Sequence, residues 1–267
     1  MKRSFLVAFS VIALCGILLP ATLVSAVYEG YETSNYLASY ECTVDGAWTA
    51  DNEWYDAMTP PNLPADFEWR QKWAMGDTTM QYFLIEFFTD STDDTGDYFQ
   101  ICLDNAADGG SAPQADDFKV ECLGHDISGL TLYQGDGSGW VEYTDYAVGT
   151  DVDMAATLTT SILNAETHWI IEVYMDRGKA EFDTSAGGYT PGIRVAVYDE
   201  STETLASWPP TSADVPDDWG TESGVYGAIP EENIPEFLTF VTAALLSSVA
   251  VVVSCYLLRR RPRTEKI

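Results

Sequence analysis

Aspartates and tryptophans carry most of the chemistry that this sequence offers. Asp90, Asp93, Asp94 and Asp97 crowd one short stretch. Clustered carboxylates suit Ca²⁺, which takes about six to eight oxygen ligands. The stretch is therefore a candidate site for structural Ca²⁺, with a solvated acidic turn as the simpler interpretation. A second acidic stretch follows the next expected strand (Asp104, Asn105, Asp108, Asp116 and Asp117), and neither stretch has EF-hand spacing.

Four residues are candidates for binding a carbohydrate. Sugars stack their C–H faces on flat aromatic rings and pair their hydroxyls with polar side chains. Trp69 and Trp73 flank Arg70 and share one face of a strand or helix, and Trp140 follows a glycine-rich turn. The alternative is that Trp69 and Trp73 fill the core, which we expect of Trp48, Trp54 and Trp169.

Catalysis has little support in the sequence. His125 and His168 are the only histidines, and His168 begins an expected strand, where a structural role is more common. No nucleophile elbow, zinc-protease motif or phosphate-binding glycine loop is present. Among so many acids a pair of carboxylates will lie together by chance, so a glycoside-acting hydrolase is the weakest alternative.

The charge of the chain excludes some partners. The formal net charge is −29, and most lysines and arginines lie near the two ends. Such a surface repels nucleic acid and anionic lipid head groups. An acidic surface attracts divalent cations. The simpler explanation of the charge is that it keeps the protein soluble in salt. The large apolar and aromatic content is typical of a folded protein rather than of an acidic disordered chain.

The two ends indicate export and a membrane anchor. Residues 1–26 have the charged start, apolar run and small residues of a signal peptide. Phe237 to Leu258 is uncharged and, as a helix about 33 Å long, would cross a bilayer. The basic tail, residues 259–267, marks the cytoplasmic side. We therefore expect a single-pass protein with its main domain outside the cell.

The region between the ends predicts an all-β fold. Apolar residues alternate with period two in short segments separated by Gly, Asp and Thr, which favours an antiparallel, jelly-roll-like β-sandwich over residues 27–206. Residues 155–163 could form a short helix, but their threonines favour a strand. Residues 207–234 are rich in proline and acids and are expected to form an extended stalk before the 235–258 segment.

Three cysteines lie in the exported part of the chain, so at most one disulfide can form within it. Cys102 and Cys122 lie on neighbouring expected strands. Alternation places Cys122 on the buried face and turns Cys102 to the opposite face, which argues against a bridge between them.

An ordered series of motifs resembles the family 9 carbohydrate-binding modules and the wider DOMON-like sandwich group. It covers residues 36–209: Val44-Asp45-Gly46, Asn52-Glu53-Trp54, Tyr82 to Glu86, Asp97 to Asp104, His168 to Val173, Gly192 to Asp199 and Trp208-Pro209. The resemblance implies a β-sandwich, glycan binding and structural Ca²⁺. The sugar-binding tryptophans of that family match no position here. Some DOMON-like domains carry haem, but no ligand pattern for it occurs here.

The C-terminus resembles the PEF-type sorting signal of archaeal surface proteins. Pro235-Glu236-Phe237 precedes the apolar span and the arginine cluster. The resemblance implies an archaeosortase that cuts near the motif and transfers the protein to a lipid anchor. A plain transmembrane anchor is the alternative.

Together these features predict a non-catalytic β-sandwich at the cell surface that binds glycan or another envelope component. The main alternative is a structural or adhesive surface protein with no small-molecule site.

Overall fold

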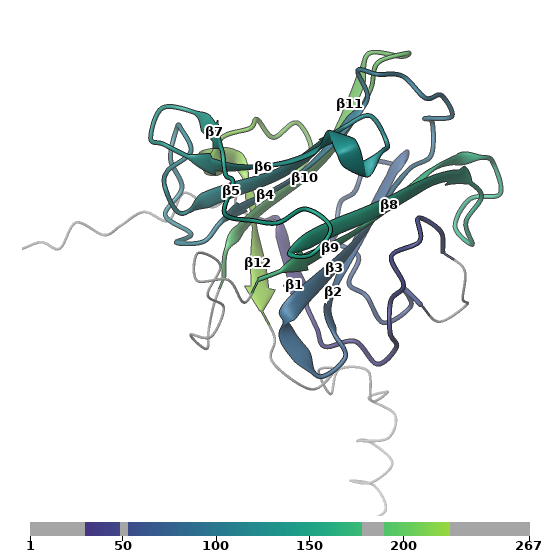
Figure 1. Cartoon of the computed structure of the whole chain (residues 1–267), viewed down its shortest axis with the longest axis horizontal. Helices are drawn as coiled ribbons and strands as arrows, with labels where there is room; N and C mark the ends of the chain where they lie inside the picture. The colour runs from purple at the N-terminus through teal and green to yellow at the C-terminus, as the bar shows by residue number, and fades with distance from the viewer. Residues whose placement is uncertain (1–29, 49–52, 178–189, 225–267) are drawn as a thin grey trace, which may run out of the picture.

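The computed structural model describes residues 30–48, 53–177 and 190–224, and these form a β-sandwich of two facing sheets (Figure 1). The all-β prediction is confirmed. The described residues contain no α-helix, only the short 3₁₀ helices η1 (Ile127–Gly129) and η3 (Pro216–Asp218) among their helical segments. Within them no helix is long and apolar enough to span a bilayer. The expected signal peptide, the sorting motif, the apolar span and the basic tail lie outside the described residues.

The larger sheet has eight strands. Its order is β1 (Glu32–Asn35), β12 (Gly220–Gly224), β10 (Gly192–Asp199), β4 (Tyr98–Asp104), β5 (Asp117–Leu123), β6 (Leu130–Gly135) and β7 (Trp140–Glu142), with β11 (Thr204–Trp208) also paired to β10. All pairs are antiparallel except β1 with β12, which is parallel. The antiparallel prediction therefore fails only where the first and last described strands meet.

The smaller sheet has four strands in the order β2 (Phe67–Ala74), β3 (Asp77–Phe87), β9 (His168–Asp176) and β8 (Val152–Thr159). Strand β8 covers most of the segment whose threonines favoured a strand, and that prediction is confirmed. Because β9 pairs with both β3 and β8, it lies in the middle of the sheet.

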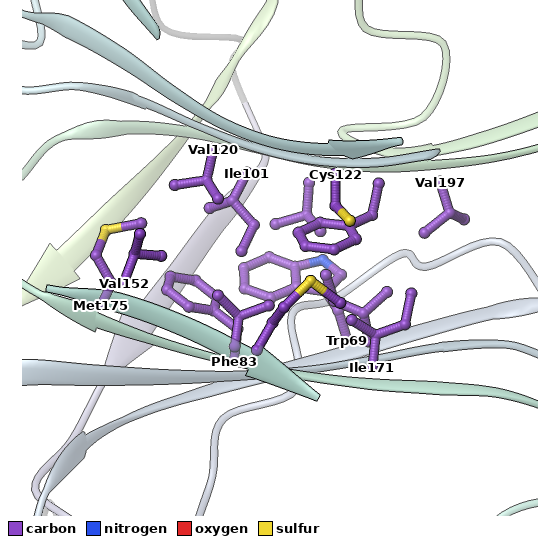
Figure 2. Close-up of a cluster of buried hydrophobic side chains, with 14 of the residues drawn as sticks. Trp69, Phe83, Ile101, Val120, Cys122, Val152, Ile171, Met175 and Val197 are labelled. Atoms are coloured by element: carbon purple, nitrogen blue, oxygen red, sulfur yellow. The ribbon is translucent and has the colours of Figure 1, made fainter. Parts of the chain in front are cut away.

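The main core fills the space between the sheets (Figure 2). Ile101, Val120, Cys122 and Val197 come from the larger sheet. They face Trp69, Phe83, Val152, Ile171 and Met175 from the smaller one. Alternate residues of each strand supply these side chains, because successive side chains of a strand point to opposite faces.

A second, smaller apolar cluster covers the outer face of the smaller sheet, where Trp48 and Trp54 pack on Leu84 and Ile170. Buried Glu172 holds the segment that carries these two tryptophans. Its carboxylate accepts hydrogen bonds from Trp54 Nε1 and from the backbone N–H groups of Asp45 and Gly46. Gly46 has φ of +75°, and a Cβ there would lie 2.8 Å from the Ala156 backbone. The Val44-Asp45-Gly46 motif thus serves to dock this segment.

The cysteine prediction is confirmed. Cys122 lies in the core between the sheets, whereas Cys102 lies on the outer face of the same sheet. Cys42, Cys102 and Cys122 are all free thiols.

The stalk prediction is wrong for residues 207–224. This segment contains part of β11, then η3 and β12, and it buries Trp208 and Trp219 almost completely. The many prolines and acids of this segment are typical of an extended chain. Burial of its two tryptophans nevertheless stabilises a folded structure. Residues 225–234 lie outside the described residues.

Candidate functional site

A cleft of about 360 Å³ opens at one end of the sandwich, where the two sheets separate. Eight residues line it: Asp93, Asp94, Thr95, Leu123, Gly124, His125, Asp126 and Trp169. Trp169 is at the start of β9 in the smaller sheet, and His125 is in the turn that follows β5 in the larger sheet. Their rings stack in parallel, with centroids 3.7 Å apart and planes 4° from parallel.

Hydrogen bonds fix the acidic loop that forms one wall of this cleft. The backbone N–H of Trp169 donates to the carbonyl of Asp90, and its indole N–H donates to the carbonyl of Thr92. Asp97 Oδ2 accepts from the Asp94 N–H at 2.9 Å, and Asp97 Oδ1 accepts from the Glu200 N–H at 2.8 Å. The loop is therefore held in one arrangement by backbone contacts on several sides.

Three carboxylates surround the imidazole of His125. Its Nε2 lies 3.6 Å from Asp90 Oδ2, and its Nδ1 lies 3.5 Å from Asp93 Oδ1 and 3.9 Å from Asp97 Oδ2. The side chains of His125, Asp90 and Asp97 are almost fully buried, whereas that of Asp93 is 78% exposed at the mouth of the cleft.

The electrostatics of the cleft favour neutral or cationic ligands. Asp93, Asp94 and Asp126 line it, and Asp90 and Asp97 lie beside His125. Burial raises the pKa of Asp97, although the backbone N–H groups of Glu200 and Asp94 oppose that rise. Hydrogen bonds from Ser128 lower the pKa of Asp126, which keeps it an acceptor. The cleft therefore combines an aromatic edge with several hydrogen-bond acceptors.

Two of the three tryptophans of the predicted carbohydrate site, Trp69 and Trp73, are inaccessible. Trp69 is 0% exposed between the sheets and packs on Phe83 and Trp208. Trp73 is also 0% exposed, with the Arg177 guanidinium over its ring. The shared face that the sequence indicated exists, but it points inward, so neither ring can stack on a sugar.

The other two predicted ligand residues lie far from each other in the fold. Arg70, on the outer face of the smaller sheet, pairs with Glu68 at 3.0 Å and lies over Trp48. Trp140, on edge strand β7 of the larger sheet, donates to Asp214 and stacks on Trp219 with centroids 6.2 Å apart. Trp69, Arg70, Trp73 and Trp140 therefore form no common site.

The predicted metal residues do come together. Asp90 and Asp97 form one potential ligand group with His125, and Asp94 and Asp97 form another with Asp199. Asp93 contacts His125 from the open side. The first group contains an imidazole nitrogen, a donor that the sequence-based calcium hypothesis lacked.

His125 and Trp169 were missed by sequence reasoning. Trp169 alternates with Ile171 and Val173 and was therefore assigned to the core. That assignment is wrong because Trp169 is at the very start of β9, where the inner face opens to solvent and the ring is half-buried. His125 follows β5 with the sequence Gly124-His125-Asp126, and a polar turn next to an acidic loop was the available signal.

His168, by contrast, has a structural role. Its Nδ1 lies 2.8 Å from the Glu166 carbonyl oxygen and its Nε2 lies 3.2 Å from Glu86 Oε2. Although burial opposes the charged form, these two partners raise the pKa of His168.

No family profile and no curated protein matches the chain. Among solved structures it is similar to a family 9 carbohydrate-binding module from Caldicellulosiruptor kristjanssonii in complex with cellotriose. That match has 14% identity, a TM-score of 0.49 and coverage of 75% of this chain and 96% of the other. The glucose complex of such a module matches with 14% identity, a TM-score of 0.47 and coverage of 73% and 97%. This is the family that the sequence motifs resemble.

Proposed function

We propose that the described domain is a non-catalytic module that binds carbohydrate in the cleft formed by Trp169, His125 and the 93–95 loop. The observation that carries the proposal is the stacked aromatic pair beside several aspartates. The cleft volume of about 360 Å³ lies within the range of small-ligand sites, about 300–1,000 Å³.

Charge narrows the ligand class. Carboxylates in the cleft repel phosphates, nucleotides and acidic peptides. They accept hydrogen bonds well from the hydroxyls of a neutral sugar, and exposed Leu123 and the edge of Trp169 add apolar surface for its C–H groups. A neutral sugar therefore suits both the carboxylates, through its hydroxyls, and the apolar surface, through its C–H groups.

A hydrolase is disfavoured by how the buried carboxylates are used. Asp97 accepts backbone N–H groups with both oxygens, and Asp90 accepts from the Thr92 N–H. These backbone hydrogen bonds give the two carboxylates a structural role beside His125, and this role disfavours their use as the acid and base of a hydrolase. The remaining alternative is a structural or adhesive surface protein that binds no small molecule.

A glycan array with the full-length chain in mild detergent tests the proposal. We expect binding to neutral polysaccharides that persists in high salt, because neutral ligands are not held by screened charges. The Trp169→Ala variant should bind the same polysaccharides more weakly. Binding that disappears in high salt would point to a cationic ligand, and no binding at all would leave the adhesive alternative.

We further propose that the domain works at the cell surface, exported by residues 1–26 and tethered through residues 235–258. An envelope glycan is then within its reach. Two tether mechanisms remain, a retained transmembrane helix or cleavage by an archaeosortase after recognition of Pro235-Glu236-Phe237. Mass spectrometry of the mature C-terminus distinguishes them, because an intact Ile267 excludes cleavage.

A further inference from the structure

The outer face of the larger sheet carries an apolar row, the outer row, that crosses four neighbouring strands. Tyr98 of β4 pairs with Leu123 of β5 and with Tyr198 of β10, and Tyr198 pairs with Leu205 of β11. Directly opposite residues share a face of a sheet. Phe99, the residue after Tyr98, lies in the core between the sheets, so the outer row points away from the core. With strands about 4.8 Å apart, the row spans about 14 Å.

The side chains of the outer row are open to a ligand. Leu123 is 56% exposed and Leu205 is 48% exposed. Between them the half-buried rings of Tyr98 and Tyr198 stack, with centroids 5.1 Å apart and planes 19° from parallel. Each ring covers one face of the other, which leaves the ring edges and the hydroxyls for other contacts. Burial raises the pKa of Tyr98, so its hydroxyl stays protonated at neutral pH and can donate a hydrogen bond.

The outer row is continuous with the cleft, because Leu123 belongs to both. Thr95 also lines the cleft, and it lies in the loop that leads into β4 at Tyr98. A molecule that extends out of the cleft past Leu123 therefore reaches Tyr98 next and then the rest of the outer row.

Hydrogen-bonding groups border the outer row on both sides. On one side, Gln100 Nε2 donates to Glu121 Oε2 at 2.6 Å in the neighbouring cross-strand pair. On the other side, exposed Glu200 accepts from the Gly96 N–H at 2.8 Å. No lysine or arginine of the described residues is exposed, so no cationic side chain on this face would attract an acidic polymer. Apolar surface, neutral hydroxyls and acceptors together suit a neutral sugar chain.

We propose that the cleft and the outer row form one binding surface for an extended neutral polysaccharide. One sugar occupies the cleft, and further sugars of the same chain lie across the outer row. Their C–H groups contact the leucines and the tyrosine edges, and their hydroxyls pair with the tyrosine hydroxyls and the bordering acceptors. The inference rests on the proposed function and adds to it that the ligand is a long chain rather than a free monosaccharide or disaccharide.

Titration calorimetry with oligosaccharides of two lengths tests the proposal. The full-length chain in mild detergent is titrated with the disaccharide and the hexasaccharide of the neutral glycans dextran, mannan and xylan. The hexasaccharide of the glycan that binds should bind about fivefold more tightly than its disaccharide, or better, because it also covers half-exposed Leu205.

A matched pair of variants assigns this gain to the outer row. Leu205→Gln should remove the gain and leave the affinity for the disaccharide unchanged. Leu158→Gln changes a 39% exposed leucine on β8 of the other sheet, and it should keep the gain. If the hexasaccharide binds no better than the disaccharide, or if Leu205→Gln keeps the gain, the inference is overturned while the proposed function stands. If no glycan binds at either length, both are overturned.

A second measurement needs no substitution. In a methyl spectrum of the wild-type chain with labelled leucines, the disaccharide should shift Leu123 alone of these three leucines. The hexasaccharide should shift both Leu123 and Leu205 and leave Leu158 in place. A hexasaccharide that binds without shifting Leu205 would overturn the inference. A Leu205 shift that appears without sugar as the protein concentration rises would assign the outer row to a second copy of the chain and would also overturn it.

Discussion

Strand β4 has an acidic cluster at each end, and the two clusters differ in what surrounds them. At its start, Asp90, Asp93 and Asp97 surround an imidazole that stacks on a tryptophan. At its end, carboxylates of Asp104, Asp108 and Asp116 gather, and Asp104 is directly paired with buried Asp117 in the next strand.

The cluster at the start of β4 has groups that can bind a ligand. The cluster at its end mainly lowers the stability of the protein. Asp104 and Asp117 each bury an oxygen without a hydrogen-bond partner. Burial, together with the charges of Asp104, Asp116 and Asp108, raises the pKa of Asp117 to about 8, against one opposing hydrogen bond from Gln114. Acid content alone is therefore a poor guide to function. The imidazole and the aromatic ring distinguish the cleft end of β4.

The largest effect is expected at an aromatic residue outside both clusters. Trp69→Ala empties a fully buried site between the sheets and should lower the free energy of unfolding by about 3–5 kcal/mol. Chemical denaturation measures this. If the variant folds at low temperature, its sugar affinity should be close to wild type, since the ring lies away from the cleft. A selective loss of sugar binding with unchanged stability would instead restore Trp69 as a ligand residue.

At the far end of β4, Asp117→Asn should stabilise the protein in a pH-dependent way. The unfolded pKa of an aspartate is about 3.9, so between about pH 4 and pH 8 the folded state holds a proton that the unfolded state releases. Wild-type stability therefore falls as pH rises through that window. Asparagine removes this dependence.

The Asp117→Asn variant should gain on the order of a few kcal/mol at pH 8 and little at pH 4. Denaturation at both pH values measures the difference. An equal effect at both would show that Asp117 is ionised throughout the range and would weaken the contrast between the two clusters.

At the cleft end, Trp169→Ala should lower sugar affinity about tenfold, or about 1.4 kcal/mol, because it removes the aromatic surface of the site. Isothermal titration with the best glycan from the array measures this. Trp140→Ala is the matched control, since that half-buried ring is at the edge of the other sheet. A larger loss from the control would place the site at β7.

The smallest effect is expected for Asp108→Asn. Asp108 is exposed, and its repulsion of the far cluster is screened by water and salt. The stability change should stay within about 0.5 kcal/mol and shrink as salt is added. Sugar binding should not change, so any loss of it would mean that the two ends of β4 are coupled.

Periodicity was enough to predict the sandwich, most of its strands and the opposite faces of Cys102 and Cys122. It could not identify the site, because strand alternation tells which face a residue occupies and not whether that face is covered. Trp69 and Trp169 both point inward, yet Trp69 lies between the sheets and Trp169 at their open end. The acidic loop was found because its residues are close in sequence. Its partner His125 was missed because only the pairing of β4 with β5 brings that turn beside the loop.

The parallel pairing of β1 with β12 has a mechanical consequence. Any pull on the chain beyond Gly224 enters the domain along β12, which pairs with β1 over Glu32–Asn35 and with β10 at Gly192 and Ile193. A force along a strand loads its hydrogen bonds in shear, all at once, rather than opening them one by one. The last described strand can thus resist a pull from the C-terminal side, as the proposed surface tether would require.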